Sequence, residues 1–321
     1  MPNSTVVVGA GIAGMACARA LAAAGVPVRV LDRGRRPGGR MASRTLAGRV
    51  TDLGASYVTA RDGSPFAAVV DDWVGRGLAR PWTDTFAVAG PDGLRDTTSG
   101  PVRYAAPGGL RSLVADLGTG LDVVQESAVR RVEPGPRVDG AEVAAAVLAL
   151  PDPQARRLLP PDLAGRLLGG EDEHPWQPTL AVAMGWDERR WPADLHGAFV
   201  NDDVVVEWIA DDGDRRGDGA PVLVAHTTPG IAAAHLDDPD RAAPEVTTAV
   251  RRALGIDTPP AWTHVHRWTF AKPSAPREAP FGLAGGVGVC GDGWRAPSKV
   301  ESAWTSGHLL GTELGTGPGS R

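Results

Sequence analysis

The sequence has only two cysteines, Cys17 and Cys290, among its 321 residues. Each lies in an apolar stretch, which is typical of small core residues and predicts neither a disulfide framework nor a metal pair. Other metal ligands are equally sparse, because His264 and His266 have no carboxylate or third ligand at a matching spacing. We therefore predict no metal site.

Further absences exclude several classes of protein. No run approaches the ~18 uninterrupted apolar residues of a transmembrane helix, and no charged leader with a cleavage site opens the chain. The formal net charge of −5 favours neither nucleic acid nor an anionic membrane as a partner. No GxSxG motif supports hydrolase chemistry. We expect a cytoplasmic protein, and the sequence leaves its oligomeric state open.

Lysine is almost absent, since Lys272 and Lys299 are the only two and arginine supplies the remaining basic charge. Together with abundant alanine, glycine and proline, this bias indicates a GC-rich bacterial coding sequence. The length and the 42% hydrophobic content are ordinary for a globular protein with a substantial core.

What the sequence does contain is a nucleotide-binding pattern at its start. The apolar run 6–8 predicts a buried strand, and GAGIAG at 9–14 makes a tight turn into a helix predicted over 15–24. A second strand is predicted over 26–31, and Asp32 follows it, about 20 residues beyond the glycines. In such a unit a pyrophosphate lies at the positive end of the helix, and the carboxylate accepts hydrogen bonds from ribose hydroxyls.

A second glycine-rich motif, PGGRMASR, occupies residues 37–44. Gly38 and Gly39 allow another close backbone approach, and Arg40 and Arg44 stand at positions i and i+4. If this segment is helical, the two guanidinium groups share one face and both address a pyrophosphate or an electron-rich ring edge.

A third motif lies near the C-terminus. An apolar strand is predicted over 283–290 and ends at Gly291-Asp292. Ser298 and Glu301 have the spacing of a capping box, with Ser298 as the N-cap of a following helix. The sequence thus predicts a second helix N-terminus far from the first.

Together these motifs resemble those of the FAD-binding amine-oxidase-like flavoproteins, and within them the bacterial renalase-like oxidoreductases. The resemblance rests on GAGIAG, Asp32 and GGRMASR, and continues in DLGASYVTARD (52–62), VLALPDPQ (147–154), HRW (266–268) and GDGWRAPSKVESAWTSG (291–307). It implies an α/β fold, namely a Rossmann-type FAD-binding domain with an inserted, mainly antiparallel β-sheet substrate domain. The expected FAD-binding domain comprises 1–60, 99–170 and 276–321, and the expected substrate domain comprises 61–98 and 171–275.

The resemblance implies non-covalent FAD as the cofactor. Val129, on a strand predicted over 128–132, would support the adenine through its backbone, and Asp292 would contact the ribityl or pyrophosphate region. The second helix N-terminus would face the pyrimidine edge of the flavin, where reduction places negative charge. The residues expected to bind FAD are Gly9, Gly11, Ile12, Ala13, Gly14, Asp32, Arg33, Gly38, Gly39, Arg40, Arg44, Gly54, Ala55, Ser56, Val129, Gly291, Asp292, Lys299, Val300 and Glu301.

The expected substrate domain has strand-like runs over 179–184, 204–209 and 222–226, separated by turn residues, which predict an antiparallel sheet. A flavin enzyme needs walls that orient the donor carbon and exclude water, which suits aromatic side chains. Because His266 and Trp268 alternate on a predicted strand, we expect them to face the same side. The candidate catalytic residues at the substrate face are Tyr57, His226, His266 and Trp268, each of which is equally compatible with an ordinary core position.

The leading interpretation is an FAD-dependent oxidoreductase that accepts a hydride from a small reduced N-heterocycle of the dihydronicotinamide-isomer type. Dioxygen would reoxidise the flavin and yield hydrogen peroxide. The alternatives are an amine oxidase or desaturase acting on a specialised metabolite and a non-catalytic FAD-binding protein. A nicotinamide-dependent dehydrogenase would explain the first motif but neither GGRMASR nor Gly291-Asp292. Ser56, in place of the family's usual glutamine, and a short hairpin region at 133–139 depart from the family pattern.

Overall fold

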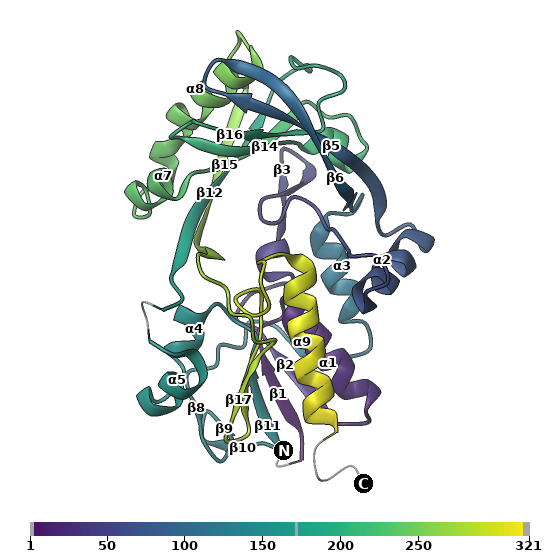
Figure 1. The fold of residues 1–321 in the computed structure, drawn as a ribbon, viewed down its shortest axis with the longest axis vertical. Helices are drawn as coiled ribbons and strands as arrows, with labels where there is room; N and C mark the ends of the chain where they lie inside the picture. Colours follow the sequence, from purple (N-terminus) through teal and green to yellow (C-terminus); the bar gives the residue numbers. More distant parts are fainter. Residues whose placement is uncertain (1–2, 171–172, 317–321) are drawn as a thin grey trace.

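The structure is a computed structural model that describes residues 3–170 and 173–316. Two large sheets lie toward opposite ends of an elongated molecule, and the first and last described residues lie at the end that holds β1 (Figure 1).

The first sheet has six strands in the order β17-β18-β11-β1-β2-β7. Its strands are β1 (Thr5–Val8), β2 (Val28–Leu31), β7 (Asp122–Val124), β11 (Ala145–Leu148), β17 (Gly282–Ala284) and β18 (Val287–Val289). All neighbouring pairs are parallel except β17 with β18. β1 is buried along its whole length between β2 and β11, as its apolar run predicts. The strand order reverses beside β1, and the carboxyl ends of strands at such a reversal form a ligand-binding crevice.

Two helices from opposite ends of the chain pack together beside this sheet (Figure 1). They are α1 (Ile12–Ala23) and α9 (Val300–Gly315). A Cβ atom at Gly307 would overlap the carbonyl oxygen of Ala13, so glycine permits this close approach. Cys17 and Cys290 are buried and unbridged, as predicted. The sheet is further covered by α2 (Pro65–Gly75) and α3 (Leu110–Leu117).

The second sheet has seven strands in the order β16-β12-β15-β14-β13-β5-β6. They are β5 (Arg80–Gly90), β6 (Gly93–Ala105), β12 (Trp176–Gly185), β13 (Gly197–Val200), β14 (Val206–Asp211), β15 (Val222–Thr227) and β16 (Trp262–Pro273). Only β13 and β5 pair in parallel, so the sheet is mainly antiparallel as predicted. β6 runs to Ala105 and therefore passes the expected boundary at residue 98.

One face of this sheet is covered by α8 (Ala243–Leu254), which follows the short helix η2 (Pro239–Ala242). The remaining short elements are the hairpin of β3 (Ser43–Leu46) and β4 (Arg49–Asp52), η1 (Gly39–Met41), β8 (Val132–Glu133), β9 (Arg137–Val138), β10 (Ala141–Glu142), α4 (Asp152–Arg156), α5 (Pro161–Leu168), α6 (Asp212–Arg216) and α7 (Pro229–Ala234). No helix within the described parts of the chain has the length and apolar character to cross a bilayer.

Two predicted strands are wrong. The segment 128–132 is unpaired until β8 begins at Val132, because no neighbouring strand is available to residues 128–131. The run 283–290 is a hairpin of two strands instead of one, because Gly285 and Gly286 adopt positive φ angles of 59° and 77° and turn the chain back.

Candidate functional site

A cavity of about 1360 Å³ lies between the two sheets. All three motifs reach it, because its lining includes Gly11 of the first, Arg40 of the second and Asp292 of the third. Strands of the second sheet supply the opposite wall through residues such as His266 on β16. Segments that are distant in sequence thus form one site at the strand-order reversal beside β1.

The first motif supplies an open helix N-terminus. Gly11 is the N-cap of α1, no side chain caps the helix, and its first turn contains no acidic residue. Ile12 and Ala13 line the cavity. The N–H groups of this turn and the helix dipole are therefore available to an anion. Gly14 does not line the cavity, because it packs directly on the Gly9 carbonyl and allows the helix to approach the turn.

Asp32 lies at the end of β2 and holds the glycine turn. One carboxylate oxygen accepts a hydrogen bond of 2.6 Å from the N–H of Ala10, and the other accepts one of 2.6 Å from Gly34. Asp32 also lines the cavity, beside Arg33. Its carboxylate thus fixes the glycine turn at the edge of the cavity.

The second motif, residues 37–44, does not form the helix that would place Arg40 and Arg44 on one face. Gly39–Met41 form the single 3-10 turn η1, and Arg44 lies on β3, so Arg40 and Arg44 do not share a helical face. The helix is wrong because Gly38 has a φ of 133° and the chain enters the β3–β4 hairpin immediately after the turn.

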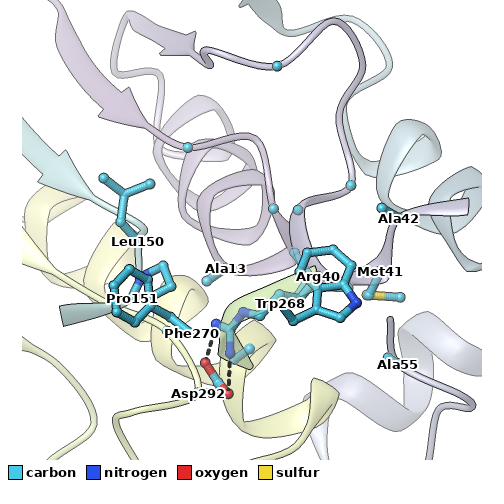
Figure 2. Close-up of a pocket in the computed structure, with 18 of the residues that line it drawn as sticks. Ala13, Arg40, Met41, Ala42, Ala55, Leu150, Pro151, Trp268, Phe270 and Asp292 are labelled. Atoms are coloured by element: carbon cyan, nitrogen blue, oxygen red, sulfur yellow. Dashed lines mark hydrogen bonds and ion pairs between the residues drawn. The ribbon is translucent and has the colours of Figure 1, made fainter. Parts of the chain in front are cut away.

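Arg40 instead joins the second motif to the third. Its guanidinium donates to both carboxylate oxygens of Asp292, with 2.8 Å between Nη1 and Oδ2, and also to the carbonyl of Ala271 at 3.0 Å. It lies 5.0 Å from the ring centroid of Trp176. Figure 2 shows the two bonds between Arg40 and Asp292 in the cavity, in the region of Phe270 and Pro151.

The predicted capping box is absent at the start of α9. The N-cap is Lys299, without a side-chain cap, and the hydroxyl of Ser298 donates instead to Asp292 at 2.7 Å. Glu301 accepts a 3.1 Å bond from the N–H of Arg61 and pairs with Lys299 at 2.9 Å, so it faces away from the cavity. Like α1, α9 therefore presents an uncapped N-terminus, and its residues Lys299 and Val300 line the cavity.

The segment that follows β4 lies between the two sheets and contacts residues of the second one. Gly54 packs against the carbonyl of Arg40 and the ring of Trp268, where a side chain would overlap, so it supports the cavity without lining it. Trp268 donates a 2.7 Å bond to the carbonyl of Leu53. Ser56 accepts a 2.8 Å bond from the indole of Trp208, which ties the cavity wall to the second sheet.

The four candidate catalytic residues all line the cavity. The ring of Tyr57 lies 5.9 Å from that of Trp208. His266 and Trp268 lie 4.4 Å apart on the same side of β16, as their alternation predicts. Burial lowers the pKa of His226 to about 4, with contributions from Arg215 and Lys272. Burial, Arg44 and His264 likewise lower the pKa of His266 to about 4, so both imidazoles are neutral at pH 7.

The structure brings most of the residues expected to bind FAD to this cavity. Three do not line it, namely Gly14, Gly54 and Glu301. The others do, namely Gly9, Gly11, Ile12, Ala13, Asp32, Arg33, Gly38, Gly39, Arg40, Arg44, Ala55, Ser56, Val129, Gly291, Asp292, Lys299 and Val300.

Sequence reasoning missed a buried ionic cluster behind the site. Asp212 pairs with Arg215 and Arg216 of its own helix, and Asp52 pairs with Arg216 at 2.9 Å. Arg215 also donates to the carbonyls of Asp52 and Ser56, at 3.1 and 3.0 Å. Although burial opposes ionisation, Arg215 and Arg216 hold the pKa of Asp212 below its usual value. This cluster fixes the segment 52–56 against the second sheet. The sequence signal was the DDGDRR run at 211–216, which reads as an ordinary surface turn.

Sequence reasoning also missed Arg111, which lines the cavity from α3. It donates to the carbonyls of Pro37 and Ser43, at 2.9 and 2.8 Å, and so clamps the second motif. Burial and the charges of Arg36 and Arg44 lower its pKa, against the opposing charge of Asp52. The available signal was its position directly after the Pro107-Gly108-Gly109 turn.

These features fit a dinucleotide cofactor. Two uncapped helix N-termini and a group of mutually repelling arginines face a cavity in which a pyrophosphate would supply the missing negative charge. The residues placed to hold it are the α1 turn, Asp32, Arg36 and the start of α9.

Comparisons with known proteins agree with this geometry. The family described as an NAD(P)-binding Rossmann-like domain matches residues 7–73. Putrescine oxidase of Kocuria rosea is 38% identical over 98 residues, which are 30% of this chain and 20% of that protein. Polyamine oxidase 1 of Oryza sativa subsp. japonica is 34% identical over 137 residues, or 38% and 27% of the two chains. Phytoene desaturase of Rhodobacter capsulatus is 51% identical over 57 residues, or 18% and 11%. The chain thus matches well under two thirds of the length of these relatives.

Solved structures resemble the whole chain. A putative protoporphyrinogen oxidase from Exiguobacterium sp. 255-15 superposes with a TM-score of 0.75 at 15% identity, over 98% of this chain and 99% of that one. Cyclohexylamine oxidase from Brevibacterium oxydans gives 0.74 at 14% identity, over 98% and 99%. Putrescine oxidase bound to putrescine gives 0.73 at 13% identity, over the full length of both chains. The chain has the Rossmann-type FAD-binding α/β fold of these amine-oxidase-like proteins.

Proposed function

We propose that this chain, with its amine-oxidase-like fold, is an FAD-dependent oxidoreductase that takes a hydride from a small reduced N-heterocycle of the dihydronicotinamide-isomer type. The observation that carries the proposal is the convergence of three motifs on one cavity with two uncapped helix N-termini. Bound FAD would supply hydride acceptance and, by reaction with dioxygen, release of hydrogen peroxide.

The chain's own residues have distinct tasks in this proposal. The turn at Gly11 and the start of α1 would bind the pyrophosphate, and Asp32 would accept hydrogen bonds from the ribose. Asp292, held by Arg40 and Ser298, would contact the ribityl or pyrophosphate region. The N-terminus of α9 lies where its N–H groups would stabilise negative charge on the flavin.

The second sheet supplies the wall that orients the substrate. Tyr57 and Trp208 offer aromatic surface that excludes water, and His266 and Trp268 form an adjoining wall on β16. The Nε2 atom of His226 is buried without a hydrogen-bond partner among the described residues. A neutral imidazole in this position can donate one hydrogen bond to a polar ring atom or accept one from it, which suits a heterocyclic substrate.

An amine oxidase or desaturase remains the second candidate function, because the matched proteins carry these names. The two functions predict different reductants for the same flavin. A non-catalytic FAD-binding protein would retain the motifs but accept electrons from neither class.

The test is the spectrum of the purified protein under anaerobic conditions. Under the proposal the protein is yellow, and dihydronicotinamide isomers made by borohydride reduction bleach the flavin. Admission of air then restores the colour with one hydrogen peroxide per flavin reduced. A colourless protein that takes up no FAD would contradict the proposal, and bleaching by amines alone would establish the second candidate.

A further inference from the structure

We propose that Lys272 is a specificity-determining residue of the cavity, whose ammonium donates a hydrogen bond to an uncharged carbonyl oxygen conjugated with the ring of the hydride donor. Glu207 is a positioning residue that holds this ammonium and offsets its charge. The inference rests on the proposed function, because it takes the donor ring to bind in this cavity. It adds a residue to which no motif and no comparison assigns a role, and it holds whatever group the ring nitrogen carries.

Lys272 lies on the face of the second sheet that lines the cavity. On β16 its register partner is Gln177 of β12, and Trp268 stands opposite Thr179 of the same strand. Since Gln177 and Thr179 are two residues apart on one strand, they point to the same face, and so do the residues opposite them. Lys272 and Trp268 accordingly both line the cavity.

Two irregularities of the sheet lie at the positions of Lys272 and Glu207. In β16, residues 269–271 stand opposite the single residue Pro178, which has no N–H group to donate to the ladder. In β14, Glu207 is the extra residue of a bulge, because its two neighbours pair with consecutive residues of β15. A bulge re-aims a side chain, and bulges are over-represented beside active sites.

An ion pair joins the two side chains across the sheet. The Nζ atom of Lys272 and the Oε1 atom of Glu207 lie 2.9 Å apart. Because β12 and β15 separate β16 from β14, the pair spans three strand spacings, about 14 Å in a regular sheet. Both side chains therefore reach over the strand that carries His226, and the charge of Lys272 contributes to the lowered pKa of that imidazole. The two side chains are 43% and 34% exposed, and so exposed an ion pair adds little stability that would account for two bulges.

The ion pair has hydrogen-bonding capacity left for a ligand. Among the described residues Nζ of Lys272 donates only to Glu207, so two of its three N–H groups have no protein acceptor. Because Glu207 offsets the ammonium charge, an anionic group gains little net attraction, and a cationic group is repelled by the ammonium. An uncharged carbonyl oxygen accepts a free N–H group without disturbing the pair, and a charged donor makes that hydrogen bond stronger than one between neutral groups.

Electron flow in the donor ring gives this contact a kinetic consequence. In a dihydropyridine the ring nitrogen donates electron density to a conjugated carbonyl, which makes its oxygen a good acceptor. When the C–H bond breaks and the hydride leaves for the flavin, the nitrogen becomes cationic and the oxygen loses that density. The hydrogen bond from Lys272 is then stronger in the ground state than in the transition state. It therefore lowers the half-saturating donor concentration without raising the limiting rate.

Three pyridines that differ in one ring substituent test the specificity on the FAD-loaded protein. Nicotinamide carries an uncharged carbonyl group, 3-methylpyridine carries none, and nicotinate carries a carboxylate. Each is titrated while perturbation of the flavin absorbance is recorded, and none has to be oxidised. We expect nicotinamide to bind at least about 10-fold more tightly than either of the others. Absence of a preference for nicotinamide over 3-methylpyridine, or tighter binding of nicotinate, would overturn the proposal.

Two variants and one control locate the effect. Lys272→Met should reduce the preference for nicotinamide to less than about two-fold, and Glu207→Gln, which removes the offsetting charge, should tighten nicotinate binding about 10-fold. Arg95→Met is the matched control, because Arg95 pairs with Asp202 at 3.0 Å, is 43% exposed like Lys272 and does not belong to the described cavity lining. It should retain the preference. A preference that survives Lys272→Met, or that Arg95→Met also removes, would overturn the assignment.

The two variants also cover a failure of folding or of cofactor binding. Lys272→Met should retain FAD, and loss of FAD from the folded variant would overturn the proposal, since Lys272 would then bind the cofactor. If Lys272→Met does not fold, the response of Glu207→Gln to nicotinate decides, and unchanged nicotinate binding in that variant would contradict the proposed role of the pair.

Anaerobic stopped-flow measurement of flavin bleaching tests the kinetic consequence, with borohydride-reduced 1-methylnicotinamide as the donor. Lys272→Met should raise the half-saturating concentration about 10-fold, while the limiting rate stays equal or rises. A lower limiting rate at an unchanged half-saturating concentration would place the contact in the transition state and overturn the proposal. If the wild type is not bleached at all, the proposed function fails, and the pyridine titrations still test Lys272 because they require no oxidation.

Discussion

Arg40 and Asp292 are 252 residues apart in sequence and form a two-bond ion pair in the lining of the cavity. The pair connects η1 to the loop before α9, and so sets the distance between the second and third motifs. A single guanidinium–carboxylate contact therefore ties the second motif to the loop that leads into α9. Loss of this ion pair should weaken FAD binding and also lower the stability of the fold.

We predict that Asp292→Asn weakens FAD binding at least about 10-fold and lowers the free energy of unfolding by about 2–3 kcal/mol, because Arg40 loses a charged partner in a largely buried place. Fluorescence titration with FAD and urea unfolding measure the two effects. Glu142→Gln in the exposed pair with Arg137 is the control and should change stability by less than about 0.5 kcal/mol. Equal effects of the two substitutions would contradict the role given to the Arg40–Asp292 pair.

The contact between α1 and α9 gives a prediction with a closely matched control. Gly307→Ala would drive a methyl group into the carbonyl of Ala13, and we expect a loss of at least about 3 kcal/mol with weaker FAD binding. Gly165→Ala, within α5, meets nothing within 4 Å and should raise stability by about 0.5–1 kcal/mol. Thermal unfolding of both variants measures the two changes in stability. A neutral Gly307→Ala would show that the helices are not in such close contact.

The buried ionic cluster should tolerate paired replacement better than single replacement. Arg215→Met removes one of the guanidinium partners of Asp212 and the donor to the carbonyls of Asp52 and Ser56, and we expect a loss of about 3–5 kcal/mol in urea unfolding. Asp212→Asn combined with Arg215→Met should lose less than the sum of the single losses, because the two side chains contact each other directly. Strict additivity would contradict a coupled cluster.

His226 predicts a specific dependence of stability on pH. Its pKa is about 4 in the folded protein, below the ordinary 6.5, so between these values the unfolded chain binds a proton that the folded chain does not. The free energy of unfolding should therefore fall as pH falls through this window, with a contribution from His226 on the order of 2 kcal/mol. His226→Gln should flatten the curve between pH 6.5 and 4. An unchanged slope in the variant would show that His226 titrates normally.

The helices and strands that depend on local pattern were predictable from the sequence. β1, β2 and α1 follow from one apolar run and one glycine turn. Three antiparallel strands of the second sheet, β12, β14 and β15, were also predicted, because turn residues separate them, whereas β5, β6 and β13 were not predicted. In each case the signal lies within about a dozen neighbouring residues.

The rest depended on partners that are remote in sequence. The Ser298 capping box is absent because Asp292 attracts the Ser298 hydroxyl, and Glu301 turns to the N–H of Arg61. Arg44 leaves the helical face because β4 offers it a strand partner. No local pattern encodes the choice between such competing hydrogen bonds, so the side-chain geometry of the site required the folded chain.

The alternation of the chain between its two sheets has a mechanical consequence. The segments 5–31, 122–148 and 282–289 belong to the first sheet, and 80–105 and 176–273 belong to the second, so the backbone crosses between them four times. Four covalent tethers oppose the wide hinge opening available to domains joined by a single linker. Ligands should then enter a pre-shaped chamber by side-chain motion at its mouth, with little of their binding energy spent on ordering the backbone.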